Sequence, residues 1–253
     1  MTKLTALLIV YNEIDHLPAV IDSVGFADEI IAVDSFSTDG TYEALSKDPR
    51  VRVVQRPFDQ YAAQRTYAIS LAQHDWILFI DADERVSVPL QKEIKTTLAS
   101  SQPKAAYYFY RQFYFKEKPL RFSGLQTDKV YRLFNKNIAR YIPHKIVHET
   151  LEVAGESGLL KNKLDHYFYH DYDDYRNRMV AYGKLKGKEL FDQEKSFSLL
   201  KLWFKPLYKF ITHYIIRLGI LDGHKGWIIS KLNALSVKVR YKELRRLQSL
   251  SPE

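Results

Sequence analysis

The 253-residue sequence contains no cysteine. That absence excludes a disulfide-stapled scaffold, a thiolate nucleophile and any zinc or iron–sulfur site built on cysteine. The chain also lacks the glycine-rich patterns G-x-G-x-x-G and G-x-x-x-x-G-K-[ST], which argues against a dinucleotide-dependent dehydrogenase and a P-loop NTPase. The 46% hydrophobic and 27% charged residues are ordinary for a folded globular protein.

Long hydrophobic runs are missing as well. No stretch approaches the roughly 18 uncharged apolar residues that a membrane-spanning helix needs. The first residues lack the basic, apolar and small-residue layout of a secretory signal peptide. We therefore expect a cytoplasmic protein that is not integral to a membrane.

Positive charge is concentrated near one end of the chain. Residues 176–253 hold 17 Lys and Arg against 6 Asp and Glu, whereas the remainder holds 21 against 24. A mildly acidic body thus carries a basic final third. This asymmetry indicates an anionic partner: nucleic acid, a membrane surface or a phosphorylated substrate.

Strand-like and helix-like segments alternate through the first hundred residues. This alternation predicts an α/β fold with a parallel sheet covered by helices, in which ligands bind beyond the carboxyl ends of the strands. The apolar patterns predict strands over 4–10, 29–33, 51–54 and 76–80, and helices over 17–24, 42–45, 61–72 and 88–98.

Polar and acidic residues follow these strands. Asp81 and Asp83 come directly after the fourth strand, where two carboxylates can point to one side of a turn. Carboxylate oxygens suit Mg²⁺ or Mn²⁺, which also bind substrate phosphates. The alternative is that these aspartates cap the next helix or face water. We favour the metal because the chain has four strand–helix units, in which the second and the fourth strand both end in acidic residues.

With these segments the chain resembles family 2 glycosyltransferases, which have the nucleotide-sugar-binding fold called GT-A. The matching segments, in the family's order and spacing, are LLIVYNE, IIAVDSFSTDGT, YAAQRTYAI and WILFIDADE. Later segments resemble a narrower group that adds glucose or a related sugar to the inner core of lipopolysaccharide. These are DKVYRLF, PHKIVHETLEVAG and LGILDGHKGWIISKLNALSVKVRYKEL. The resemblance covers nearly the whole chain and implies a Rossmann-like mixed sheet followed by amphipathic helices.

The resemblance also implies that individual residues bind the nucleotide-sugar or a metal. Two of the nucleotide-sugar residues have alternative roles: Asp34 could equally cap its own loop, and Arg65 could be a surface residue. His148 and His170 are alternatives to His166 as a metal ligand. The implied nucleotide-sugar site contains Val10, Tyr11, Asn12, Glu13, Asp34, Arg65 and Asp81, and the implied metal site contains Asp81, Asp83 and His166.

An inverting transfer needs a base that takes a proton from the acceptor hydroxyl. The family uses a carboxylate in the acceptor half, and Glu149 occupies the matching place. Asp128 is the competitor and Asp171 a remote third. The aromatic run 105–115 and the segment 129–134 are expected to pair as antiparallel strands in this half, with most of the aromatic rings packed in the core.

The sequence of the basic final third predicts helices over 173–191, 197–220 and 223–247, and Pro206 is expected to kink or divide the second of these. In that second helix cations recur every four residues among apolar and aromatic side chains, a pattern of helices that lie in a membrane interface. The alternative is a helix packed on the catalytic domain with its lysines in solvent. The recurring residues are Lys201, Lys205, Lys209, His213 and Arg217.

We therefore predict a nucleotide-sugar-binding half over 1–100, an acceptor-binding half over 101–172 and a basic helical extension over 173–253. The expected activity is inverting, metal-dependent transfer of a hexose, glucose in first place, from a UDP-sugar to a lipopolysaccharide-core or other lipid-linked glycan. The protein would work peripherally at the inner face of the cytoplasmic membrane, without nucleic acid. The rivals are a haloacid-dehalogenase-like phosphatase with Asp81 as nucleophile, and a non-catalytic binder of anionic membrane or nucleic acid.

Overall fold

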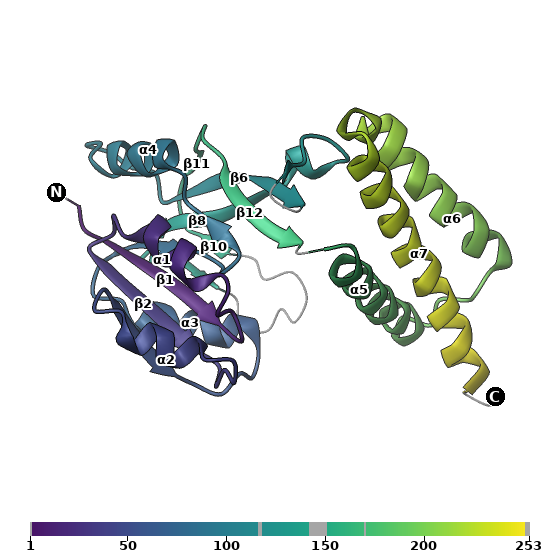
Figure 1. Ribbon diagram of the computed structural model, residues 1–253, viewed down its shortest axis with the longest axis horizontal. Helices are drawn as coiled ribbons and strands as arrows, with labels where there is room; N and C mark the ends of the chain where they lie inside the picture. The colour runs from purple at the N-terminus through teal and green to yellow at the C-terminus, as the bar shows by residue number, and fades with distance from the viewer. Residues whose placement is uncertain (1, 116–117, 142–150, 170, 251–253) are drawn as a thin grey trace. The chain divides into compact units, whose positions relative to one another are not determined.

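The computed structural model describes residues 2–115, 118–141, 151–169 and 171–250. The chain divides into two compact units. Residues 1–111 with 129–166 form the first unit, a sheet covered by helices, and residues 112–128 with 167–253 form the second, which is mainly helical (Figure 1). The boundaries between the units fall inside two strands, at residues 111/112 and 166/167.

The expected alternation of strands and helices is confirmed in the first unit. The four strands pair in parallel, in the order β3-β2-β1-β4. Because helices cover both faces of a parallel sheet, its strands consist of nearly continuous apolar residues. The elements are β1 (Leu4–Val10), α1 (Leu17–Val24), β2 (Glu29–Asp34), α2 (Thr41–Lys47), β3 (Val51–Gln55), α3 (Tyr61–Leu71), β4 (Trp76–Phe79) and α4 (Val88–Leu98).

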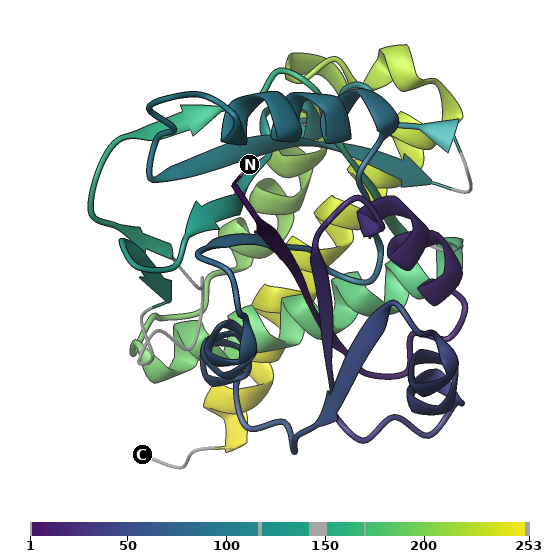
Figure 2. The same ribbon diagram turned by 90° about the vertical axis from the view of Figure 1, so that its left-hand side faces the viewer.

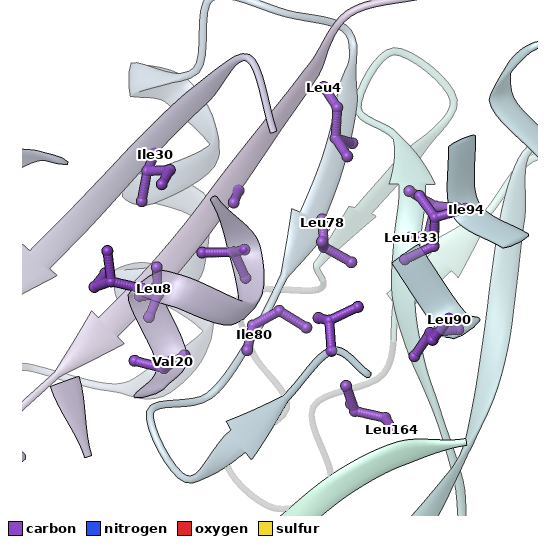
Figure 3. Packing of buried hydrophobic residues seen from close by; sticks show 14 of the residues in the cluster. Leu4, Leu8, Val20, Ile30, Leu78, Ile80, Leu90, Ile94, Leu133 and Leu164 are labelled. Carbon is purple, nitrogen blue, oxygen red and sulfur yellow. The ribbon is translucent and has the colours of Figure 1, made fainter. Parts of the chain in front are cut away.

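Alternate residues of each strand enter different cores because successive side chains of a strand point to opposite faces. Leu8 of β1 belongs to the core that includes residues of α1 and α4, whereas Leu7 belongs to the core that includes residues of α3. Figure 3 shows the first core, where Val20 of α1 lies by Leu8 and Ile94 of α4 by Leu133. Burial on both faces holds the ends of β1, β2 and β4 in fixed positions.

The second half of the sheet is antiparallel, as expected. β8 (Lys129–Asn135) pairs antiparallel with β4, and β6 (Ala106–Phe115) pairs antiparallel with β8. β12 (Leu164–Tyr169) and β5 (Glu84–Arg85) complete the order β3-β2-β1-β4-β8-β6-β12-β5. Helix α4 covers this half of the sheet (Figure 2). The short strands β7 (Lys118–Pro119) and β11 (Ser157–Leu159) pair with β6, whereas β9 (Ala139–Tyr141) and β10 (Leu151–Val153) form a separate two-stranded sheet.

The second unit is built around α7 (His224–Leu250), which packs against both α5 (Tyr172–Asp192) and α6 (Leu199–Ile211) (Figure 1). Helices α5 and α7 approach closely at Gly183, where an added Cβ would lie 2.6 Å from the carbonyl oxygen of Ser236. Pro206 lies inside α6 and does not divide it; the helix continues to Ile211. A π-turn, η2 (Thr212–Ile216), and a 3₁₀ turn, η3 (Gly219–Asp222), then lead to α7.

Loop 121–123 is tied to these turns. The Asp222 carboxylate accepts hydrogen bonds from the backbone N–H groups of Arg121 (3.0 Å) and Phe122 (2.9 Å). His213 Nδ1 lies 2.8 Å from the carbonyl oxygen of Ser123, so Nδ1 carries a hydrogen and donates it to this oxygen. Burial, with the nearby charges of Lys209 and Arg217, lowers the pKa of His213 to about 4. The sequence prediction that His213 belongs to an exposed basic stripe is therefore wrong.

A neutral buried histidine makes the stability of the protein depend on pH. Below pH 6.5 the imidazole takes up a proton in the unfolded chain but stays neutral in the folded protein down to about pH 4. The free energy of unfolding should therefore fall as the pH falls through this window. Denaturant titrations at pH 7 and pH 4.5 measure how much free energy of unfolding is lost between the two pH values. This loss should be about 2 kcal/mol larger in the wild type than in His213→Asn. The exposed His224, changed to Asn, is the control. Equal losses in wild type and His213→Asn would contradict the assignment.

Candidate active site

The carboxyl ends of β1 and β2 border an open cavity of about 590 Å³. Small-molecule sites usually measure about 300–1,000 Å³. Four aromatic rings line it, those of Tyr11, Phe36, Phe58 and Tyr61, each between 47% and 58% exposed. The rings of Phe58 and Tyr61 meet edge to face at 4.9 Å. Flat apolar faces of this kind suit the stacking of a base or a sugar ring. The remaining lining residues are Ile9, Val10, Glu13, Ser35 and Pro57.

Two loops beside this cavity are held in shape by side-chain hydrogen bonds. Asn12 adopts a left-handed conformation (φ 55°), and its Oδ1 accepts from the backbone N–H of Thr38 at 2.8 Å. Asp34 is fully buried, and its carboxylate accepts from both the N–H and the hydroxyl of Ser37. Gln55 Nε2 donates to the same carboxylate at 3.0 Å. In this structure Asp34 therefore caps its own loop, the alternative raised from the sequence.

Asp81 lies between two guanidinium groups. Arg132 pairs with one carboxylate oxygen, and Arg65 Nη2 lies 3.3 Å from the other. Arg65 is not a surface residue: its guanidinium stacks 5.0 Å above the ring of Phe79 and donates to the Tyr141 hydroxyl at 3.2 Å. Burial alone would raise the pKa of Asp81, but the charges of Arg132 and Arg65 outweigh it and hold the pKa well below its usual range. Asp81 is therefore a permanent anion.

Asp81 belongs to a buried cluster of charged side chains that also contains Glu84, Arg132 and Arg111. Glu84 is fully buried, with one oxygen 2.7 Å from Arg132 Nη2 and 3.7 Å from Arg111 Nη1. Its other oxygen accepts the backbone N–H of Asp81 at 3.1 Å. The β4–β8 register, which pairs Leu78 with Leu133, brings Arg132 to this point. Sequence reasoning did not single out Arg132 or Glu84. The available signal was a lone arginine in the otherwise apolar strand VYRLF.

Asp83 meets His166 across the β5–β12 pairing. The two short strands run antiparallel, with His166 opposite Glu84. His166 Nε2 lies 3.2 Å from Asp83 Oδ2, and the imidazole side chain is 4% exposed. Burial alone would raise the pKa of Asp83, but the hydrogen bond and the charge of His166 lower it below its ordinary value. The structure thus brings together two of the three residues expected at a metal.

The donor atoms at this point fit a divalent cation in part. One carboxylate and one imidazole are adjacent, and Mg²⁺ or Mn²⁺ commonly takes its remaining ligands from substrate phosphates and water. The oxygens of Asp81, in contrast, face Arg132 and Arg65. Within the described ranges no three Asp, Glu or His side chains converge on one point. Among the described residues, Asp83 and His166 would hold such a cation, together with substrate and water.

The structure bears unequally on the remaining candidate bases and metal ligands. Glu149 and His148 lie in 142–150, outside the described residues, as does His170. Asp128 follows a 3₁₀ turn, η1 (Leu125–Thr127), in the second unit. Asp171 caps helix α5, where its Oδ1 accepts the backbone N–H of Asp174 at 2.8 Å. That capping bond gives Asp171 a structural role.

Comparison of the sequence with known proteins points to one enzyme family. The sequence model of the family described as Glycosyl transferase family 2 matches residues 5–155. A Rickettsia felis protein named as an uncharacterized glycosyltransferase is 30% identical over 258 residues, which cover 97% of this chain and 90% of that protein. The lipopolysaccharide core biosynthesis glycosyltransferase LpsC of Rhizobium meliloti is 27% identical over 250 residues, 94% of this chain and 93% of LpsC.

A solved structure agrees with the fold. The crystal structure of S. aureus TarS matches 98% of this chain and 55% of its own length, with a TM-score of 0.50 and 15% identity. At that identity the likeness concerns the fold alone. Together with the mixed sheet and the family match it confirms the expected GT-A fold.

The charge cluster around Arg132 gives a stability prediction. Arg132→Met removes the main partner of the buried Glu84 carboxylate and should lower the free energy of unfolding by about 3–5 kcal/mol. The double variant Glu84→Gln/Arg132→Met removes the orphaned charge as well and should be less destabilised than Arg132→Met. Denaturant unfolding of the four proteins of this cycle measures both effects.

The exposed pair of Arg140 and Glu152, 3.0 Å apart, provides the control. Arg140→Met should change the free energy of unfolding by less than about 1 kcal/mol, because both partners are solvated. If the losses from Glu84→Gln and Arg132→Met simply add, the two side chains are not energetically coupled and the cluster does not act as a unit.

Proposed function

Because the chain belongs to glycosyltransferase family 2, we propose that it moves a hexose, with glucose as the first candidate, from a UDP-sugar to a lipid-linked glycan. The family alone makes it a nucleotide-sugar-dependent glycosyltransferase. The structural observation that supports metal-dependent transfer is the Asp83–His166 pair, 3.2 Å apart, which joins the turn after β4 to β12. Strand β4 pairs with β1, whose end borders the aromatic cavity.

The donor would bind across the ends of these strands. The aromatic cavity suits a flat nucleobase, and the loops fixed by Asn12 and Asp34 would shape its rim. Arg65 would pair with a phosphate, for which a guanidinium is well matched. Asp81, held as an anion, would accept hydrogen bonds from ribose hydroxyls. The full proposed donor set is Val10, Tyr11, Asn12, Glu13, Asp34, Arg65 and Asp81.

Asp83 and His166 would hold Mg²⁺ or Mn²⁺ together with the donor diphosphate. When bound, the cation would supply positive charge that stabilises the departing diphosphate. Asp83 is suited to this because its pKa lies below its ordinary value, which keeps it ionised. Asp81 as a third ligand stays a prediction, since its oxygens pair with Arg132 and Arg65.

The proposed chemistry is a single inverting displacement. The acceptor hydroxyl oxygen forms a bond to the anomeric carbon, while the bond from that carbon to the diphosphate oxygen breaks. Glu149 accepts the proton of the hydroxyl; the resemblance to the narrower family group supports this choice. Asp128 is the alternative base. General-base catalysis of this kind contributes about 10²–10⁴-fold to the rate.

The acceptor we propose is the core of lipopolysaccharide or another lipid-linked glycan. The name and the nearly full-length match of LpsC support it, and so do the later sequence segments. Such an acceptor implies work at the cytoplasmic face of a membrane, as a peripheral protein. In the parts of the chain that the structure describes, every helix is too short or too polar to cross a bilayer.

The two rival functions lose their support. A phosphatase would need Asp81 as a free nucleophile, but its carboxylate pairs with Arg132 and Arg65. The family match makes the chain a glycosyltransferase, so a purely non-catalytic binder is not needed to explain the acidic strand ends.

The metal proposal is tested by Asp83→Ala. We expect turnover of the UDP-sugar to fall by about 10²-fold or more, because the charge that stabilises the leaving diphosphate is lost. Thermal shift should show stabilisation of the wild type by UDP with Mn²⁺ beyond either alone, and no such increment in the variant. Asp192→Ala, which removes an exposed carboxylate at the end of α5, should behave as wild type. Undiminished turnover in Asp83→Ala would overturn the proposal.

The base is tested by Glu149→Gln and Asp128→Asn, which remove a proton acceptor while keeping size. Glu149→Gln should retain UDP binding but lose about 10²-fold or more in transfer, whereas Asp128→Asn should retain transfer. Single-turnover assays with UDP-glucose measure the chemical step. The reverse pattern, with only Asp128→Asn impaired, would show that Asp128 is the base.

A further inference from the structure

Helix α6 turns its apolar side chains outward. Leu200 is 70% exposed, Trp203 65% and Phe204 64%. Single exposed apolar residues are common on protein surfaces, but a contiguous set on one helix is not. We call this set the α6 apolar face: Leu199, Leu200, Trp203, Phe204, Leu207, Tyr208 and Ile211.

The opposite side of α6 is the one that packs within the second unit. Leu202 is 8% exposed and Lys209 is half-buried. Burial, with the charges of Arg217 and Arg240, lowers the pKa of Lys209. A surface helix of a globular protein normally buries its apolar stripe and exposes its charges. Helix α6 instead leaves most of its large apolar side chains exposed, and the side that packs holds Leu202 and Lys209.

The apolar surface continues beyond the helix. The turns η2 and η3 expose five more large aliphatic side chains, between 47% and 65% each. Lys201 and Lys205 of α6 are also exposed, and about 100° of rotation per residue places them along one flank of the apolar face. The five aliphatic residues are Ile215, Ile216, Leu218, Ile220 and Leu221.

Helix α7 supplies a row of positive charges beside this face. Lys231, Lys238 and Arg245 recur every seven residues, which is close to two helical turns. Each lies over an aromatic ring: Lys231 is 4.7 Å from that of Trp227, Lys238 is 5.4 Å from that of Trp203, and Arg245 is 5.5 Å from that of Phe197. Because Trp203 belongs to the α6 apolar face, the Lys238 contact joins the charges to it. We call these three residues the α7 cation row.

We propose that the α6 apolar face and the α7 cation row form one surface that docks on an anionic lipid bilayer, with α6 lying in the interface. Tryptophan and tyrosine favour the headgroup level, and each nearby cation is attracted to anionic lipid. A second copy of this chain fits less well, because residues 176–253 hold 17 Lys and Arg against 6 Asp and Glu and would repel their equivalent. The inference deepens the proposed peripheral location and rests on that part of the proposed function.

Vesicle co-sedimentation of the full chain tests the surface, without donor or acceptor. The wild type should bind vesicles of phosphatidylcholine mixed with phosphatidylglycerol, and bind pure phosphatidylcholine more weakly. High salt should release it in part, because screening shortens the reach of exposed charges to about 8 Å already at physiological ionic strength. Equal binding to both vesicles, or none, would overturn the proposal.

Two variants separate the components. Leu200→Glu/Phe204→Glu/Leu207→Glu should reduce binding at least about tenfold at every salt concentration, because the buried apolar area is lost. Lys231→Glu/Lys238→Glu/Arg245→Glu should remove the salt-sensitive part. Matched controls on α5 are Leu185→Glu, at a side chain 56% exposed, and Arg176→Glu/Lys184→Glu/Lys188→Glu, at three exposed cations. The second control changes the net charge as much as the cation-row variant does. If it weakens binding equally, only net charge matters and the surface is wrong.

A third measurement needs only one conservative variant. Brominated lipids should quench the fluorescence of Trp203 in the wild type, seen as the difference from Trp203→Phe. Sedimentation velocity examines the second-copy alternative: a dimer that the Leu200→Glu/Phe204→Glu/Leu207→Glu variant dissociates, with no vesicle binding, would overturn the proposal. UDP-dependent thermal stabilisation should be unchanged in all variants, so failure of membrane docking and failure of the proposed sugar transfer are read separately.

Discussion

The ion pair of Arg132 with Asp81 and Glu84 is the constraint on which the first unit depends. A buried guanidinium, 2% exposed, is costly unless carboxylates surround it, and both partners come from the turn after β4. The same contacts therefore do two things: they hold β8 against the end of β4, and they keep Asp81 ionised beside the cavity. The same three charged side chains stabilise the fold and position the site. Substitution of any one of them should therefore change both the free energy of unfolding and the geometry of the site.

The site lies where the parallel and antiparallel halves of the sheet meet. The parallel strands bring the aromatic cavity and the acidic turn to one edge, as the carboxyl ends of such strands do. The other strands supply the side chains that pair with the two aspartates of this turn: Arg132 of β8 pairs with Asp81, and His166 of β12 contacts Asp83.

The helical unit is held together by close helix packing and hydrogen bonds. Its interior is closed by the approach of α5 and α7 at Gly183 and by the ties of loop 121–123 to Asp222 and His213. With that interior complete, α6 is left with its apolar side outward. A helix that leaves most of its large apolar side chains exposed is suited to an apolar environment outside the protein. The proposed lipid-linked acceptor and the outward face of α6 are therefore consistent with each other.

The sequence by itself determined the strands and helices of the first hundred residues, the acidic turn and the family. Apolar periodicity is local, so β1, α1 and α4 could be read from their own residues, and the Asp81–Asp83 spacing marked the turn. Only the tertiary structure decided which of these residues meet. Arg132 pairs with carboxylates 48 and 51 positions away, and no local pattern encodes that distance. Equally, a four-residue spacing placed Lys205 and His213 on one stripe, yet packing exposed the first and buried the second. Periodicity tells which side chains share a helix face, and only the neighbouring elements decide whether that face meets protein or solvent.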